Sequence, residues 1–167
     1  ERFFAAVEAE HGVLRSFGVA SFGPVDLRRT SPTFGRILAT PKPGWANVDT
    51  PARLAARFAT PVAIDTDVNA AALAEAAYGA GQHCGTVVYV TVGTGIGAGA
   101  ALGGRTLKGL LHPEMGHIRV LRHERDRGFG GVCPFHGDCL EGLASGTAIR
   151  ARYGVPLERL PPGHEAT

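Results

Sequence analysis

Two cysteines and a histidine lie close together in the segment Cys133-Pro-Phe-His136-Gly-Asp-Cys139. Thiolates and neutral imidazoles are ligands that Zn²⁺ prefers, and four of them complete a tetrahedral site. We expect His117 to be the fourth ligand, because it follows a glycine and the basic loop after it can bring the two segments together. His112 precedes a proline and His123 lies inside that loop, so neither is preferred. The alternative is a pair of surface cysteines beside an unrelated histidine.

Glutamates flank these expected ligands at Glu114 and Glu141. A zinc ion with four protein ligands keeps no open position for water, so the predicted site is structural and does not generate a zinc hydroxide. We therefore expect the metal to hold the two carboxylates in place.

Asp67 is a second residue that could do chemistry. It follows a strand predicted at 61–65 and precedes a helix predicted from about Asn69 to Tyr78. Open α/β sheets usually bind ligands at this point, and a helix N-terminus favours a carboxylate. Within reach of a substrate hydroxyl, Asp67 could accept the proton as the oxygen attacks phosphorus. The alternative is that Asp65, Asp67 or Asn69 only caps the helix.

A glycine-rich stretch runs from Gly93 to Gly99 after an apolar segment, and Gly103-Gly104 follows as a hairpin signal. Because glycine has no Cβ atom, this backbone can approach a phosphate group closely. Tight turns alone would also explain the glycines.

Apolar segments alternate with helix-like segments along the chain. The sequence predicts strands at 17–22, 61–65 and 87–92 and helices after Thr50-Pro51 and from about Asn69. This alternation is typical of an α/β fold whose sheet is covered on both faces. The long connection 25–48 contains Trp45, which we expect either to stack on a ligand or to pack the loop onto the body.

Composition excludes several classes of protein. The 167 residues carry a net charge of +2, which is too near neutral to favour binding to nucleic acid or to an anionic membrane. No apolar run approaches the ~20 residues that cross a bilayer. The cysteines number three and no secretory leader opens the chain, so we expect reduced thiols and a cytoplasmic protein.

Taken together, these motifs resemble the ROK family of sugar kinases and sugar-responsive repressors, and they cover most of residues 17–150. The segments that carry the resemblance are Ser21-Phe-Gly-Pro-Val-Asp26, Thr40-Pro-Lys-Pro-Gly-Trp-Ala-Asn47, Asp65-Thr-Asp-Val-Asn-Ala-Ala-Ala-Leu-Ala-Glu75, Val92-Gly-Thr-Gly-Ile-Gly97, His112-Pro-Glu-Met-Gly-His117 and Cys133-Pro-Phe-His-Gly-Asp-Cys-Leu-Glu141. The last of these resembles the zinc segment of bacterial fructokinases more than the C-x-C-G-x-x-G-C form of many glucokinases and repressors.

The resemblance implies an α/β, actin-like ATPase (ribonuclease H-like) fold, with parts of two lobes around a central cleft. Residues 1–84 would belong to the N-terminal lobe with the catalytic base, and 85–167 to the C-terminal lobe with the phosphate loop and the zinc segment. The implied reaction is ATP-dependent phosphorylation of a hexose, with fructose favoured, Mg²⁺ on the nucleotide and a homodimer in the full-length protein.

The resemblance also implies a role for each matching residue. Asp67 would be the catalytic base, and Asn47, Glu114, His117 and Glu141 would bind the sugar. The ATP phosphates would lie against Gly93, Thr94, Gly95 and Gly97. Structural Zn²⁺ would be held by His117, Cys133, His136 and Cys139.

Three family features have no match in this sequence. These are the D-x-G-G-T phosphate hairpin, a later glycine-rich adenosine segment and the terminal helices, so we expect an internal piece of a kinase that shows little or no turnover alone. The alternatives within the family are a glucokinase or mannokinase, and a sugar-sensing repressor module, which would not need Asp67 as a base. The alternative outside it is a stand-alone zinc module.

Overall fold

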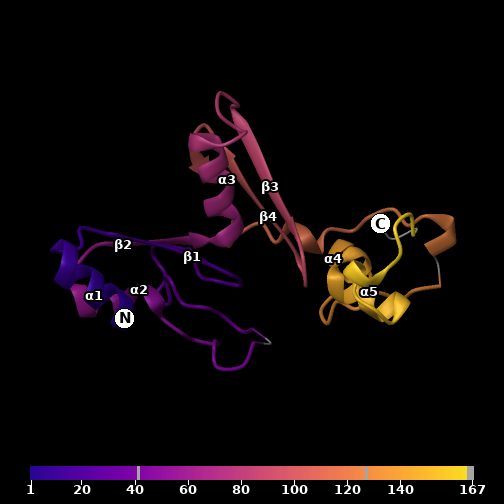
Figure 1. The fold of residues 1–167 in the computed structure, drawn as a ribbon, viewed down its shortest axis with the longest axis horizontal. Coiled ribbons are helices and arrows are strands. Elements are labelled where there is room, and N and C mark those ends of the chain that lie inside the picture. Colours follow the sequence, from indigo (N-terminus) through magenta and orange to yellow (C-terminus); the bar gives the residue numbers. More distant parts are fainter. Residues whose placement is uncertain (41, 127, 165–167) are drawn as a thin grey trace.

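In the residues that the structure describes, the chain folds into two small β-sheets with helices beside them (Figure 1). The computed structural model describes residues 1–40, 42–126 and 128–164. Its helices are α1 (Arg2–His11), α2 (Thr50–Phe58), α3 (Asp67–Tyr78), α4 (Leu140–Ala144) and α5 (Gly146–Tyr153), and its strands are β1 (Phe17–Ser21), β2 (Val62–Thr66), β3 (Thr86–Val92), β4 (Ile96–Leu102) and β5 (Arg105–Thr106). None of the described helices has the length and apolar character needed to span a membrane.

The first sheet is the parallel pair of β1 and β2, and aromatic side chains fix helices against it. Phe17 of β1 forms a buried cluster with Leu54 and Phe58 of α2. The ring of Phe4 on α1 meets the Phe17 ring edge-on, with ring centroids 4.9 Å apart. This cluster holds α1 and α2 at the same end of the molecule as the sheet (Figure 1).

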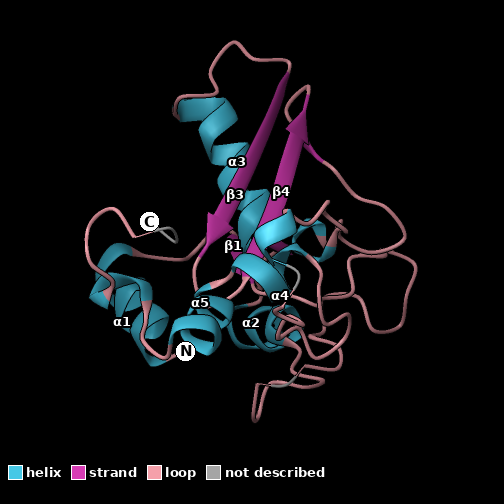
Figure 2. Ribbon diagram, turned by 90° about the vertical axis from the view of Figure 1, so that its right-hand side faces the viewer, coloured by secondary structure: helices cyan, strands magenta, loops and turns pink. Residues whose placement is uncertain are grey.

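The second sheet is antiparallel, with the strand order β3-β4-β5. Gly103 and Gly104 form the turn between β4 and β5, and their positive φ angles of 53° and 75° are easily adopted by glycine. The predicted hairpin is therefore confirmed. The helix α3 lies alongside β3 and β4 (Figure 2), and a Cβ atom at Gly99 would collide with the backbone of Asn69 in α3. Glycine at this position allows the helix to pack directly on the strand.

The expectation that both sheet faces are covered is wrong for the described part of the chain. On β3, the side chains of Val88, Val90 and Val92 are 55%, 55% and 65% exposed. Successive side chains in a strand point to opposite faces, and α3 covers only the face opposite these valines. On the first sheet, Gly18 and Ala20 are likewise exposed.

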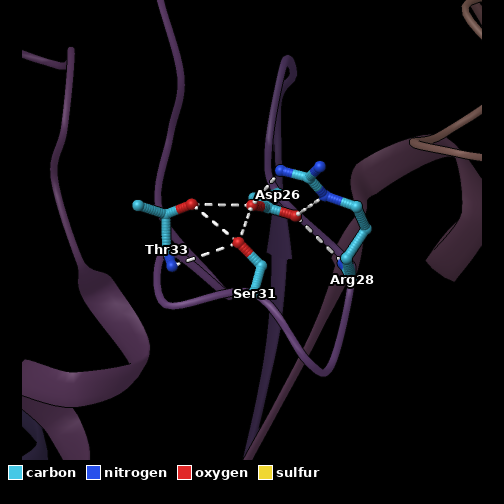
Figure 3. A network of polar contacts seen from close by, with 4 residues as sticks. All are labelled: Asp26, Arg28, Ser31 and Thr33. Carbon is cyan, nitrogen blue, oxygen red and sulfur yellow. Dashed lines mark hydrogen bonds and ion pairs between the residues drawn. The ribbon is translucent and has the colours of Figure 1, made fainter.

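The long connection after β1 is ordered by a buried carboxylate (Figure 3). Asp26 is 0% exposed, and its carboxylate accepts hydrogen bonds from the Arg28 guanidinium at 2.8 and 3.0 Å. The hydroxyls of Ser31 and Thr33 donate to the same carboxylate at 2.6 and 2.7 Å. Donation by Arg28 and by the two hydroxyls outweighs the effect of burial and holds the pKa of Asp26 well below its ordinary value. The connection is thus a folded loop and not a structureless linker.

Replacing this buried carboxylate should destabilise the fold. We expect Asp26→Asn to lower the free energy of unfolding by about 2 kcal/mol, because the amide cannot accept all of the hydrogen bonds that Arg28, Ser31 and Thr33 donate to the carboxylate. The difference in the free energy of unfolding between wild type and Asp26→Asn should be complete above about pH 5. It should shrink below about pH 4, since Asp26 then becomes protonated in the unfolded chain while it stays ionised in the folded one. Urea unfolding at several pH values measures this, with the exposed Glu10→Gln as the control. Equal stability of Asp26→Asn and wild type at pH 7 would contradict it.

Candidate functional site

A cavity of about 760 Å³ is lined by segments that lie far apart in the sequence. These segments are the turn after β1, the residues Ala39, Thr40 and Lys42 of the long connection, the start of α3, the turn between β3 and β4, the segment 112–117 and the segment 132–147. The volume lies within the range of small-molecule sites. The cavity therefore joins both sheets to the region that precedes and includes α4.

The cavity collects most of the predicted site residues. Those on its wall are Asp67, Gly93, Thr94, Gly95, Gly97, Glu114, His117, Cys133, His136 and Glu141. Asn47 lies outside this set in the described part of the chain; it is exposed on its loop with a left-handed φ of 63°, and its N–H donates to Ile37 O at 2.8 Å. A role for Asn47 in binding sugar stays a prediction.

Asp67 is the first residue of α3, and its side chain is exposed. The N-cap is Thr66, whose hydroxyl accepts the Asn69 N–H at 3.2 Å, so the capping alternative does not apply to Asp67. Asp67 Oδ1 accepts the N–H of Val68 at 2.9 Å. No described residue donates a hydrogen bond to its other carboxylate oxygen, which leaves that oxygen available to a ligand in the cavity.

Asp65 has a different role from Asp67, because it ties the first sheet to the second. Its carboxylate accepts hydrogen bonds from the Asn69 amide at 2.9 Å and from the Thr106 hydroxyl of β5 at 2.8 Å, and it pairs with Lys108 at 3.1 Å. Burial alone would raise the pKa of Asp65, but these donors and the Thr66 N–H hold it below its ordinary value. The network fixes the start of α3, and with it the position of Asp67.

The turn between β3 and β4 is held by the start of α5. The N–H of Gly146 donates to Gly93 O at 2.7 Å, and the Thr147 hydroxyl donates to Thr94 O at 2.8 Å. The Ile96 N–H donates to Glu141 Oε2 at 2.9 Å, and a Cβ atom at Gly95 would lie only 2.6 Å from that oxygen. A side chain at Gly95 would therefore displace the Glu141 carboxylate from its contact with the turn.

Four nitrogen and sulfur ligands converge beside the cavity. The ligand atoms of His117, Cys133, His136 and Cys139 all lie within 4.8 Å of one another. Cys133 Sγ lies 3.6 Å from His117 Nδ1 and 3.8 Å from His136 Nδ1, and Cys139 Sγ lies 3.5 Å from His117 Nδ1. Tetrahedral Zn²⁺ with ordinary bond lengths sets a sulfur-to-nitrogen separation of about 3.5 Å, so this set fits zinc.

The burial of the cluster bears on whether it could hold a cation. Cys139 is 0% exposed. Burial, together with the neighbouring Cys133 thiol, raises the pKa of the Cys139 thiol above its ordinary value. A divalent cation reverses this effect because it stabilises the thiolate form. The donor set therefore suits a bound Zn²⁺ better than free thiols.

His117 connects this cluster to the cavity. Its Nδ1 faces both sulfurs, while its Nε2 lies 3.8 Å from Glu114 Oε2. A histidine that binds a metal through one ring nitrogen commonly directs the other toward a carboxylate, which fixes the orientation of the ring. Glu114 itself has a left-handed backbone, with a φ of 50°.

Sequence reasoning set aside one residue that the structure places in the site. His112 lines the cavity, and its side chain is only 7% exposed. The sequence feature that could have identified His112 is its position two residues before Glu114, in a segment that carries the family resemblance.

Comparison with known proteins settles the family. The family model described as "ROK family" matches residues 1–165. The chain belongs to the ROK family. It is 56% identical over 147 residues to the fructokinase of Zymomonas mobilis and 45% identical over 147 residues to that of Lactococcus lactis. These matches cover 88% and 87% of this chain but 49% of each relative, so the chain spans about half the length of the curated relatives it matches.

Solved structures of ROK proteins share the fold. The ROK hexokinase from Thermus thermophilus aligns with a TM-score of 0.70 at 35% identity, over 92% of this chain and 50% of that one. A ROK family glucokinase from Streptomyces griseus, in complex with glucose and AMPPNP, aligns with a TM-score of 0.66 at 30% identity, over 90% and 46%. The predicted actin-like ATPase fold is confirmed. A ROK family transcriptional regulator aligns with a TM-score of 0.69 at 29% identity, over 90% and 36%, so the fold alone does not separate kinase from regulator.

The metal cluster makes a prediction about composition. We expect the full-length protein that contains this chain to carry about one Zn²⁺ per chain, and Cys139→Ser to reduce this below about a tenth, because three ligands bind zinc far more weakly than four. Metal analysis after gel filtration measures the content. Cys84→Ser removes an exposed cysteine outside the cluster and should leave the zinc content unchanged. Protein that binds no zinc when zinc is supplied would contradict the assignment.

Proposed function

We propose that this chain forms the central part of a hexose kinase that transfers the γ-phosphoryl group of ATP to fructose, giving fructose 6-phosphate. The observation that carries the proposal is that Asp67, Glu114, Glu141 and the glycine-rich turn line a single cavity. Fructose is favoured as the hexose because the curated relatives with 56% and 45% identity are named fructokinases.

Asp67 is the proposed general base. Its Oδ1 is oriented by the Val68 N–H, and its second oxygen is available to accept the proton of a sugar hydroxyl. The hydroxyl oxygen attacks the γ-phosphorus as this proton leaves, and the bond from phosphorus to the ADP oxygen breaks. A regulator needs no such base, so the presence of Asp67 on the cavity wall favours the kinase over a sugar-sensing regulator.

Carboxylates are the proposed sugar ligands. Glu114 is 47% exposed at the cavity, and Glu141 keeps Oε1 for a ligand while its Oε2 accepts the Ile96 N–H. Each ionised oxygen accepts hydrogen bonds from hydroxyl groups, which suits a polyhydroxy substrate. His117, whose Nε2 lies 3.8 Å from Glu114 Oε2, would bind the sugar beside that carboxylate.

Gly93, Thr94, Gly95 and Gly97 are the proposed nucleotide contacts. They lie on the cavity wall, where backbone without side chains can approach phosphate oxygens. The Streptomyces griseus relative, which was solved with AMPPNP, supports a nucleotide in this fold. Mg²⁺ bound with ATP would neutralise negative charge on the β- and γ-phosphates.

The proposed role of Zn²⁺ is to order this wall of the cavity. His117, Cys133, His136 and Cys139 would hold it, which fixes the His117 ring beside Glu114 and places Cys139 two residues before Glu141. With four protein ligands the metal has no open position, so it takes no part in the reaction. The division into lobes at residues 84 and 85, and a homodimer, stay predictions.

Sugar phosphorylation by the full-length protein tests the proposal. With ATP and Mg²⁺, we expect kcat/KM for fructose to exceed the values for glucose and mannose. Asp67→Asn should lower kcat by about 10²–10⁴-fold, because the amide cannot accept the proton, while the KM for fructose changes by only a few-fold.

The matched control is the exposed Glu10→Gln on α1, which should leave kcat and KM unchanged. Wild-type rates in Asp67→Asn would overturn its assignment as the base. Absence of turnover with every hexose, together with sugar-dependent release from operator DNA, would replace the kinase with a regulator.

A further inference from the structure

His112 lies between two segments of the cavity wall that are far apart in the sequence. Its Nε2 accepts the N–H of Val25 at 3.3 Å, across 87 residues of chain. The ring also occupies the space beside Gly23, where a Cβ atom would lie 2.7 Å from His112 Cε1. The His112 side chain therefore packs against the turn that follows β1, residues 22–25.

The same imidazole faces the Glu114 carboxylate. His112 Nε2 lies 3.4 Å from Glu114 Oε1, while His117 Nε2 lies 3.8 Å from Glu114 Oε2. Two imidazole rings therefore flank the carboxylate, one fixed by the metal cluster and the other fixed by the backbone of the turn after β1.

The hydrogen bond from Val25 uses the same ring nitrogen that approaches Glu114. An Nε2 atom that accepts the Val25 N–H has no proton to donate, so its 3.4 Å approach to Glu114 Oε1 is a contact and not a hydrogen bond. Glu114 Oε1 thus keeps its capacity to accept hydrogen bonds from hydroxyl groups in the cavity.

The turn after β1 also carries the contacts that fix the neighbouring loop. The Phe22 ring packs edge-on against Trp45, with centroids 5.2 Å apart, and Lys42 Nζ lies 3.5 Å from the centre of the Phe22 ring. Phe22 and Lys42 both line the cavity. His112 joins this wall to the segment that carries Glu114, because its Nε2 accepts the Val25 N–H from the same turn.

We propose that His112 is a positioning residue for substrate binding: by accepting the Val25 N–H and packing beside Gly23, it fixes the segment 112–117, and with it Glu114, against the turn 22–25, so that a hexose can contact both walls at once. The proposal rests on the proposed function, because it assigns His112 to the sugar side of that site. His112 acts through Glu114 and the turn, so it should affect the affinity for the sugar more than the rate of phosphoryl transfer.

Two substitutions in the full-length protein remove the contact from opposite sides. His112→Phe keeps a ring but has no acceptor for Val25, and Gly23→Ala places a methyl group where the imidazole lies. We expect each to raise the KM and the calorimetric Kd for fructose about tenfold, which corresponds to the loss of one hydrogen-bonded contact, while kcat changes less than threefold.

Rescue distinguishes positioning from general stabilisation. His112→Gln places an amide oxygen at the distance of Nε2 along the side chain, so it can accept the Val25 N–H and should restore the KM to within about threefold of wild type. The exposed His11→Phe on α1 is the matched control and should change nothing. If His112→Phe does not fold, the KM values of Gly23→Ala and His112→Gln show whether His112 positions the sugar-binding wall.

Failure of this inference and failure of the proposed function give different results. Wild type that phosphorylates fructose, with an unchanged KM in both His112→Phe and Gly23→Ala, would overturn the role of His112 alone. Equal loss of kcat in those variants, without recovery in His112→Gln, would also overturn it. Wild type that neither binds nor phosphorylates a hexose would overturn the proposed function and this inference with it.

Discussion

The convergence of two thiols and two imidazoles is the interaction on which the rest of the site depends. The four side chains come from segments on either side of a long basic loop, and their ligand atoms lie within 4.8 Å of one another. Buried thiols at this distance are unfavourable as anions and weak as hydrogen-bonding partners, so a divalent cation is the natural way to stabilise them. Glu114 and Glu141 are attached to this cluster through His117 and Cys139, and both carboxylates lie on the cavity wall.

A second set of polar contacts places the opposite wall. Asp65 and Asn69 join the start of α3 to β5 and to the backbone of β4, where Asn69 accepts the Ala100 N–H at 3.2 Å. Close packing at Gly99 brings the helix onto the sheet, so that Asp67 and the glycine-rich turn line the same cavity. The site is therefore built from segments of both sheets together with the segment that carries the metal cluster, and no one of these segments contains it alone.

Local patterns predicted much of the fold and the grouping of His117, Cys133, His136 and Cys139. The strands, the hairpin at Gly103-Gly104 and the start of α3 follow from short-range periodicity and turn chemistry, and the spacing of Cys133, His136 and Cys139 indicated a shared ion. Even locally, α2 begins at Thr50 with Asp49 as its cap, earlier than the helix predicted after Thr50-Pro51. Contacts across long distances were not predictable: the bond from Val25 to His112 spans 87 residues, and no pattern in the sequence indicates it.

The most direct test of this account is the affinity of the full-length protein for fructose with zinc bound and after its removal by a chelator, measured by calorimetry without ATP. Loss of the ion should release His117 and Cys139, and with them the two glutamates. We therefore expect the affinity to fall at least about tenfold and to return when Zn²⁺ is restored. Equal affinity in the two states, with the protein folded in both, would show that the carboxylates do not depend on the cluster and would contradict the account.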